Sequence, residues 1–197
     1  MFLSHTSLIQ DAHPPVLLSK ICSPCGRGLN PALLSLVQAV DKMGGKFYNP
    51  FMRKGKRQTV AIAESCTGGL LGHLLTETPG ASDYFRGGVI AYSNRVKTSL
   101  LGVSGKILKK QGAVSDPVAR QMAKGVRRKM KADIGLGITG IAGPGGGSKE
   151  RPVGLVYIAL SKKGTAACKR FLFSGKRSTI KKKAAQKALV LLRAFLR

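Results

Sequence analysis

The sequence TVAIAESCTGGLLGHLL, residues 59–75, changes character twice along its length. Thr59–Ala63 is a short apolar run typical of a buried strand, and Glu64–Gly69 is a turn of small and polar residues. A second apolar run, through about Leu75, predicts a helix. A strand, a small-residue turn and a helix in this order place polar groups at a helix N-terminus, where free backbone N–H groups stabilise anions.

The same alternation continues along the chain. We expect a second strand at Gly87–Tyr92 and short helices at 94–101 and 104–110. Ser115-Asp116-Pro117 begins a longer helix, because a capping residue followed by proline suits a first turn. We interpret His73, on the apolar face of the first helix, as a core residue. Further strands are expected at 134–138, 152–160 and 166–173, and the last two should form a hairpin around Lys163-Gly164. A terminal helix is also expected. The residues on its apolar face should be Ile180, Ala184, Ala188, Leu191, Leu192 and Phe195.

These elements predict a single α/β domain with three layers, α/β/α, around a mixed sheet. Residues 1–29 lack periodicity and are interpreted as an irregular N-terminal extension, and residues 30–197 as the domain. Within that domain, Asn30-Pro31 begins a further expected helix that ends at Gly44-Gly45.

The composition is strongly basic: 34 Lys+Arg against 8 Asp+Glu give a formal net charge of +26. Such a chain attracts nucleic acid non-specifically. Aromatic residues are only 6%, so a dedicated nucleic-acid module is not indicated, and most of the excess is interpreted as solvated surface. No apolar run is long enough for a membrane-spanning helix and the N-terminus is a poor signal peptide, so a cytoplasmic protein is expected. Cys22 and Cys25 lack a second pair of ligands, so no metal site is expected.

Three features are candidates for a catalytic or binding role, and each also has a purely structural interpretation. Ser65 could be a nucleophile beside an oxyanion site, or a helix cap. Residues 135–147 hold seven glycines in thirteen positions, and could cradle a ligand or form a turn; the dinucleotide-binding interpretation fails because no helix and no later acid follow. Lys97, just past the second strand with Tyr92, could be a general base only if its pKa falls; otherwise it is surface.

Several ordered motifs are shared with one known family. The chain resembles the CinA C-terminal domain family, the nicotinamide-nucleotide amidohydrolases, in its stand-alone, PncC-like form. The resemblance covers about residues 31–196. Its segments are AESCTGG (63–69), TETPGASDYFRGGVIAYSNRVKTSLLGV (76–103), GAVSDPVARQMAKG (112–125), ITGIAGPGGG (138–147), RPVGLVYIAL (151–160) and FSGKRSTIKKKAAQKAL (173–189).

The resemblance implies deamidation of nicotinamide mononucleotide to nicotinate mononucleotide and ammonia, without metal or cofactor. Ser65 would be the nucleophile, Lys97 the base, and Tyr92 a group that orients and relays. It also implies a homodimer. The implied substrate contacts are Cys66, Thr67, Gly68 and Gly69 of the turn, Ser82, Thr139, Gly140 and Gly143, with Arg177 holding the phosphate.

The alternative is a nucleotide- or nucleic-acid-binding protein on the same scaffold, linked to competence or DNA damage as the family name suggests. The basic C-terminal helix is its motivation.

Overall fold

The computed structural model describes residues 58–195, so the expected extension 1–29 and the expected helix after Asn30 lie outside the described residues. The elements follow the order strand, helix, strand, three helices, three strands, helix. They are β1 (Val60–Glu64), α2 (Leu70–Thr76), the 3-10 turn η2 (Ala81–Asp83), β2 (Phe85–Ile90), α3 (Asn94–Leu101), α4 (Gly105–Gln111), α5 (Asp116–Lys129), β3 (Ile134–Gly140), β4 (Leu155–Lys162), β5 (Thr165–Leu172) and α6 (Arg177–Phe195).

The sheet has five strands in the order β2-β1-β3-β4-β5. β1 pairs in parallel with β2 and β3, while β4 is antiparallel to both β3 and β5. The predicted mixed sheet and the hairpin at Lys163-Gly164 are therefore confirmed. β4 begins at Leu155 rather than at Pro152, where a residue without a backbone N–H cannot donate to the ladder.

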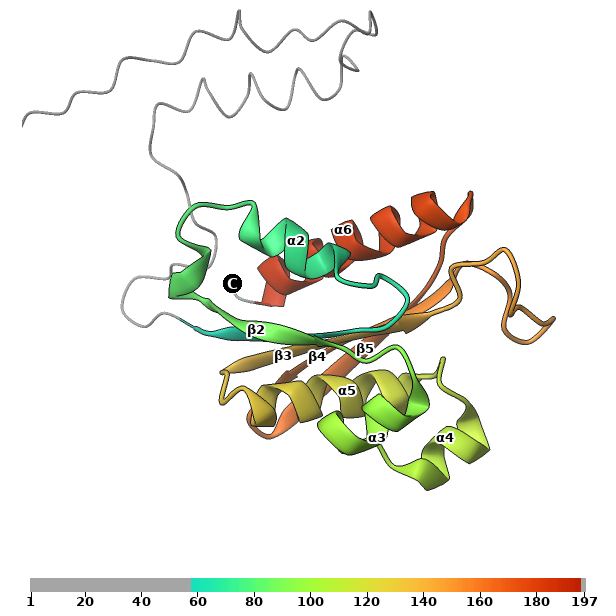
Figure 1. Ribbon diagram of the computed structural model, residues 1–197, viewed down its shortest axis with the longest axis horizontal. Helices are drawn as coiled ribbons and strands as arrows, with labels where there is room; N and C mark the ends of the chain where they lie inside the picture. The colour runs from blue at the N-terminus through green and yellow to red at the C-terminus, as the bar shows by residue number, and fades with distance from the viewer. Residues whose placement is uncertain (1–57, 196–197) are drawn as a thin grey trace, which may run out of the picture. The chain divides into compact units, whose positions relative to one another are not determined.

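Helices cover both faces of the sheet, as Figure 1 shows: α2 and α6 lie on one side, and α3, α4 and α5 on the other. Successive side chains of β1 point to opposite faces of the sheet and so contribute to two different hydrophobic cores. Val60 and Ile62 join the large-residue core under α6, whereas Ala61 and Ala63 join the core against α3 and α5. This confirms the three-layer α/β/α architecture.

Two glycines of β3 allow α5 to approach the sheet closely. A Cβ at Gly135 would lie 2.1 Å from the Ala123 carbonyl oxygen, and one at Gly137 would lie 2.5 Å from that of Ala119. Their role is helix–sheet packing. The first part of the glycine-rich stretch 135–147 is therefore strand, and its loop begins only after Gly140.

The prediction that His73 is a core residue is wrong. Its side chain is 61% exposed and lies 3.7 Å from Glu77. α2 buries Leu71 and Leu75 against the sheet, and His73, two positions from each, turns to the opposite side of this short helix.

Across residues 58–195, no helix combines the length and apolarity that a membrane span requires.

Candidate active site

A cavity of about 270 Å³ opens where the parallel strands β1, β2 and β3 end. Ligands of open α/β sheets bind at this edge, outside the carboxyl ends of the strands. The cavity is built from the β1–α2 turn, Tyr92 and Lys97 at the start of α3, the loop before α5, the end of β3 with the loop after it, and the first residue of α6. Its lining residues are Ser65, Cys66, Tyr92, Lys97, Ala113, Val114, Thr139, Gly140, Ile141, Ala142, Gly143, Gly145, Gly146 and Arg177.

Ser65 is the first residue after β1, and the neighbouring strand fixes its backbone. Its N–H donates to the carbonyl oxygen of Ile138 at 3.0 Å. The residue is 8% exposed, and its Oγ lies 3.1 Å from Nζ of Lys97. The hydroxyl therefore points to a basic group and not to the amides of α2, so its contact is not that of a helix cap.

Lys97 lies on α3 and is 1% exposed, which excludes the surface interpretation. Its Nζ lies 2.7 Å from the carbonyl oxygen of Ala91, 3.1 Å from that of Tyr92, and 3.1 Å from the Ser65 hydroxyl. The two carbonyls can only accept hydrogen bonds, whereas the hydroxyl can also donate. An ammonium would donate to all three oxygens, whereas a neutral amine would donate to the two carbonyls and accept from the hydroxyl; the neutral form is the one that a base for Ser65 requires.

Electrostatics favour the same form of Lys97. Burial lowers the pKa of its amine from the ordinary value of 10.5, because the charged ammonium would lose its hydration. Neither of the two ion pairs found among residues 58–195 includes this amine. A buried amine without a carboxylate beside it is suited to accept a proton from Ser65.

Backbone amides of the turn after Ser65 form the second part of the site. Gly68 and Gly69 have φ values of 60° and 97°, which glycine adopts without strain. The N–H groups of Cys66, Thr67 and Gly68 have no hydrogen-bond acceptor within the described part of the chain. Of these three residues only Cys66 lines the cavity with Ser65, so its amide is the candidate donor for an anion beside the Ser65 hydroxyl.

Gly69 differs from the other turn residues because its N–H is already occupied. It donates to the carboxylate of Glu64 at 2.9 Å, and the amides of Leu71 and Gly72 donate to the same carboxylate at 3.2 and 2.8 Å. Glu64 is only 2% exposed. It fixes the start of α2 and thereby the turn, a role that sequence reasoning missed; a carboxylate directly before a helix N-terminus is the signal that could have revealed it.

Cys66 and Thr67 contribute unequally to the cavity. Cys66 lines it, and burial raises the pKa of its thiol to about 12, so the thiol stays protonated and is a poor nucleophile. Thr67 is 0% exposed and its hydroxyl has no partner among the described residues. Because Thr67 is fully buried and does not line the cavity, it offers neither its amide nor its hydroxyl to a ligand in this structure.

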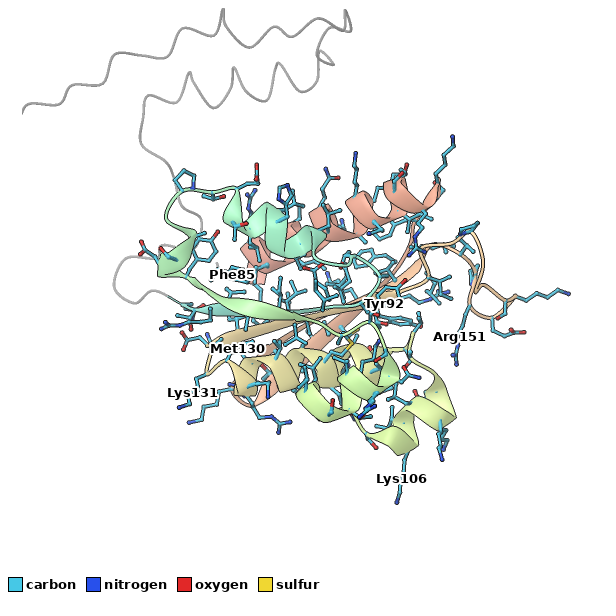
Figure 2. The ribbon with its side chains drawn as sticks, in the orientation of Figure 1. Phe85, Tyr92, Lys106, Met130, Lys131 and Arg151 are labelled. Atoms are coloured by element: carbon cyan, nitrogen blue, oxygen red, sulfur yellow. The ribbon has the colours of Figure 1, made fainter. Side chains whose placement is uncertain are left out.

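Tyr92 and Arg177 meet at the mouth of the cavity. Arg177 donates from Nη2 to the Tyr92 hydroxyl at 3.0 Å and from Nη1 to the carbonyl oxygen of Gly143 at 2.7 Å. The Tyr92 ring is 62% exposed (Figure 2), and this residue reaches Lys97 only through its carbonyl group. Since its hydroxyl bonds to neither Ser65 nor Lys97 in this structure, the expected relay role has no geometric support here.

Thr139 and Gly140 end β3 and line the cavity with Gly143. The Thr139 hydroxyl donates to the Ala113 carbonyl at 2.9 Å, so it ties the loop before α5 to the sheet. Ala113 and its neighbour Val114 line the cavity in consequence, a contribution that the sequence did not indicate.

Ser82 is not brought to this site. It lies in η2, before β2, whereas the cavity lies beyond the other end of that strand. The parallel pairing of β2 with β1 places Ser82 at the amino end of the sheet. Within one chain, the expected contact of Ser82 with the substrate is wrong for this reason.

Comparison with known sequences agrees with the motifs. The CinA C-terminal domain model matches residues 51–196. The chain belongs to the CinA family. A putative competence-damage inducible protein of Moorella thermoacetica is 55% identical over 139 residues, which are 71% of this chain and 34% of that protein. A CinA-like protein of Desulfotalea psychrophila is 42% identical over 96% of this chain and 46% of its own length. The chain thus spans about a third to a half of these CinA relatives.

Solved CinA-family structures share the fold. The competence/damage inducible protein CihA of Agrobacterium tumefaciens has a TM-score of 0.69 at 39% identity, covering 71% of this chain and 86% of that one. A CinA superfamily protein of Enterobacter cloacae has a TM-score of 0.68 at 34% identity, covering 71% and 83%. These matches show the CinA fold and family.

Proposed function

We propose that this chain is a serine-dependent amidase that hydrolyses the carboxamide of nicotinamide mononucleotide to nicotinate mononucleotide and ammonia. The observation that carries the proposal is the 3.1 Å contact between the Ser65 hydroxyl and the buried amine of Lys97. A pure binding protein has no use for an amine held out of water, since burial of an ionisable group costs stability. A base beside a nucleophile explains that cost.

The first half of the reaction forms an ester on Ser65. The Ser65 proton passes to Lys97 as Oγ bonds to the carboxamide carbon, and the carbonyl electron pair becomes an oxyanion. The amide of Cys66, next to Ser65 in the cavity lining, stabilises that charge. The oxyanion then collapses, the carbon–nitrogen bond breaks, and Lys97 returns its proton to the departing nitrogen, which leaves as ammonia.

The second half restores the enzyme. Water attacks the ester carbon and gives its proton to Lys97; the second tetrahedral oxyanion collapses and Lys97 protonates the departing Ser65 oxygen. Nicotinate mononucleotide is released. Nothing in this sequence of steps requires a group beyond Ser65, Lys97 and the amide of Cys66.

Substrate recognition in the proposal relies on Arg177. Its guanidinium lies at the cavity mouth, and its planar fork suits paired phosphate oxygens. Its present acceptors, the Gly143 carbonyl and the Tyr92 hydroxyl, are neutral and would yield to a charged phosphate. The nicotinamide ring would then extend inward toward Ser65.

The test is ammonia release from nicotinamide mononucleotide by the intact chain and by Ser65→Ala. We expect the variant to lose roughly 10³-fold or more in kcat, as in other enzymes that lose their nucleophile. Ser99→Ala, on the exposed side of α3, is the matched control and should retain full turnover. Unchanged turnover in folded Ser65→Ala would refute the proposal.

A further inference from the structure

Seven lysine and arginine residues of this chain lie at the end of the sheet opposite the cavity. α5 runs from Asp116, beside the cavity loop, to Lys129, and the β4–β5 turn lies at the same far end of the sheet. In Figure 2, Lys131 lies at one end of the sheet, well away from Tyr92. We call the cations at this end the distal basic patch. Its members are Lys124, Arg127, Arg128, Lys129, Lys131, Lys162 and Lys163.

Acids do not neutralise the distal basic patch. Neither of the ion pairs in the described residues, His73–Glu77 and Arg120–Asp116, includes a member. Among the described residues, Asp133 is the one acid that lines these hollows. It lies in the larger one with Arg127, Lys162 and Lys163 and offsets part of their charge, and its carboxylate accepts hydrogen bonds from the N–H and hydroxyl of Thr59. All members except Arg127 are exposed. Cations at a helix C-terminus are favourable, but residues on the β4–β5 turn cannot be explained by the α5 dipole alone.

Arg127 gives the patch a fixed centre. It lines two hollows, of about 200 and about 300 Å³, one on each side. The bare backbone of Gly135 lets the stem of Arg127 pack on β3, because a Cβ there would lie 2.6 Å from that of Arg127. The Arg127 Nε is buried and has no hydrogen-bond partner in residues 58–195. A buried atom cannot contact a polymer in solvent, so the phosphate contact is expected from the outer Nη groups of this half-buried guanidinium, whose planar fork suits phosphate oxygens.

We propose that the distal basic patch binds the phosphate backbone of double-stranded nucleic acid, separately from the amidase site. Several lysine and arginine side chains close together can contact successive phosphates of a nucleic-acid backbone, which carries one negative charge per nucleotide. The duplex is favoured over a single strand because none of the described residues that line the two hollows is an aromatic side chain on which unpaired bases could stack. Contacts to phosphates alone predict binding without sequence preference.

An anionic membrane fits the patch less well. The exposed large apolar residues of the described part are Ile90, Tyr92, Leu100, Leu172 and Val190, and none of them lines the two hollows, so the described residues there offer no apolar side chain for insertion.

The experiment compares two charge reversals of equal size in the intact chain. The patch variant is Arg128→Glu with Lys162→Glu, and the control is Lys106→Glu with Lys109→Glu on α4; all four positions are exposed. The probe is a labelled 20-base-pair DNA duplex of mixed sequence, titrated from 50 to 300 mM salt. We expect the patch variant to lose about tenfold or more in affinity, and its log-affinity against log-salt slope to fall by about 2, one for each lost phosphate contact.

Four outcomes would overturn the proposal. One is an equal loss in both variants, which would make net charge the only cause. A second is no measurable duplex binding by the parent chain at 150 mM salt. Tighter binding to a 20-nucleotide single strand, or to vesicles containing phosphatidylserine, would favour those partners instead. Ammonia release should stay the same in both variants, so a failure of this proposal is distinguishable from a failure of the amidase proposal.

Discussion

Lysine side chains have opposite environments at the two ends of the sheet. At the carboxyl ends of the parallel strands, Lys97 is 1% exposed and three neighbouring oxygens surround its amine. At the other end, Lys162 projects into solvent among six further cations. Burial converts a lysine from a permanent charge into a base, whereas exposure keeps it a source of long-range attraction. Chemistry is therefore expected at the first end and electrostatic binding at the second.

The largest effect is expected from exchanging the amine for a thioether at each end. Lys97→Met should lower kcat for ammonia release by roughly 10³-fold or more, because Ser65 loses its proton acceptor. Lys162→Met should leave turnover within about twofold. Both rates are measured at saturating nicotinamide mononucleotide, with circular dichroism to verify folding. Equal rates for the two variants would remove the distinction between the two ends.

Arginine offers the next comparison. Arg177→Ala should lower kcat/KM for nicotinamide mononucleotide by about 10–100-fold, chiefly through KM, because a charge-assisted hydrogen bond contributes about 1.5–3 kcal/mol. Nicotinamide riboside, which lacks the phosphate, should be affected little. Arg128→Ala in the distal basic patch is the matched control. A similar loss with both substrates would show that Arg177 acts on the cavity shape and not on the phosphate.

The pH dependence tests the charge state of Lys97 directly. Its pKa is lowered by burial, so the neutral, active form predominates above a pKa that lies below 10.5. As pH falls through that pKa, the amine gains a proton and kcat/KM should fall about tenfold per pH unit. Activity is thus lost on the acid side. A profile whose acid limb has its midpoint at or above 10.5 would contradict a buried lysine base.

The smallest effect is expected at Glu64. Glu64→Gln keeps one acceptor for the α2 amides but loses the charge, so the free energy of unfolding should fall by about 1–2 kcal/mol. Because the turn amides are then less well fixed, kcat should fall while KM changes little. Glu77→Gln, on the exposed side of the same helix, is the control for stability. A loss of stability without any change in kcat would limit Glu64 to a structural role.

The spacing of apolar residues predicted the fold well, because most helices and strands bury the residues that this spacing places on one face. The apolar stripe on α6 is an example: Ile180, Ala184, Ala188 and Leu192 are all buried, as their spacing indicates. The error at His73 arose because α2 is too short for periodicity to fix its buried face. The burial of Lys97 was not readable from spacing either, since it depends on how α3 packs over the end of β2.

The candidate site was predictable in its main members and not in its support. Ser65 and Lys97 were identified through the family resemblance, and the structure places them in contact. The carboxylate of Glu64 and the backbone of Ala113 are contributed by contacts between segments that no single motif contains. Ser82 shows the converse: its motif is intact, but topology puts it at the wrong end of β2 for its own chain's cavity.

The length of α5 has a consequence for how the two ends can operate together. Its 14 residues extend for about 21 Å. Counter-ions at physiological ionic strength attenuate fields between exposed charges beyond about 8 Å. Phosphates gathered at the far end of this helix would therefore leave the proton affinity of the buried amine almost untouched, and one molecule could hold a polymer and turn over a small substrate at the same time.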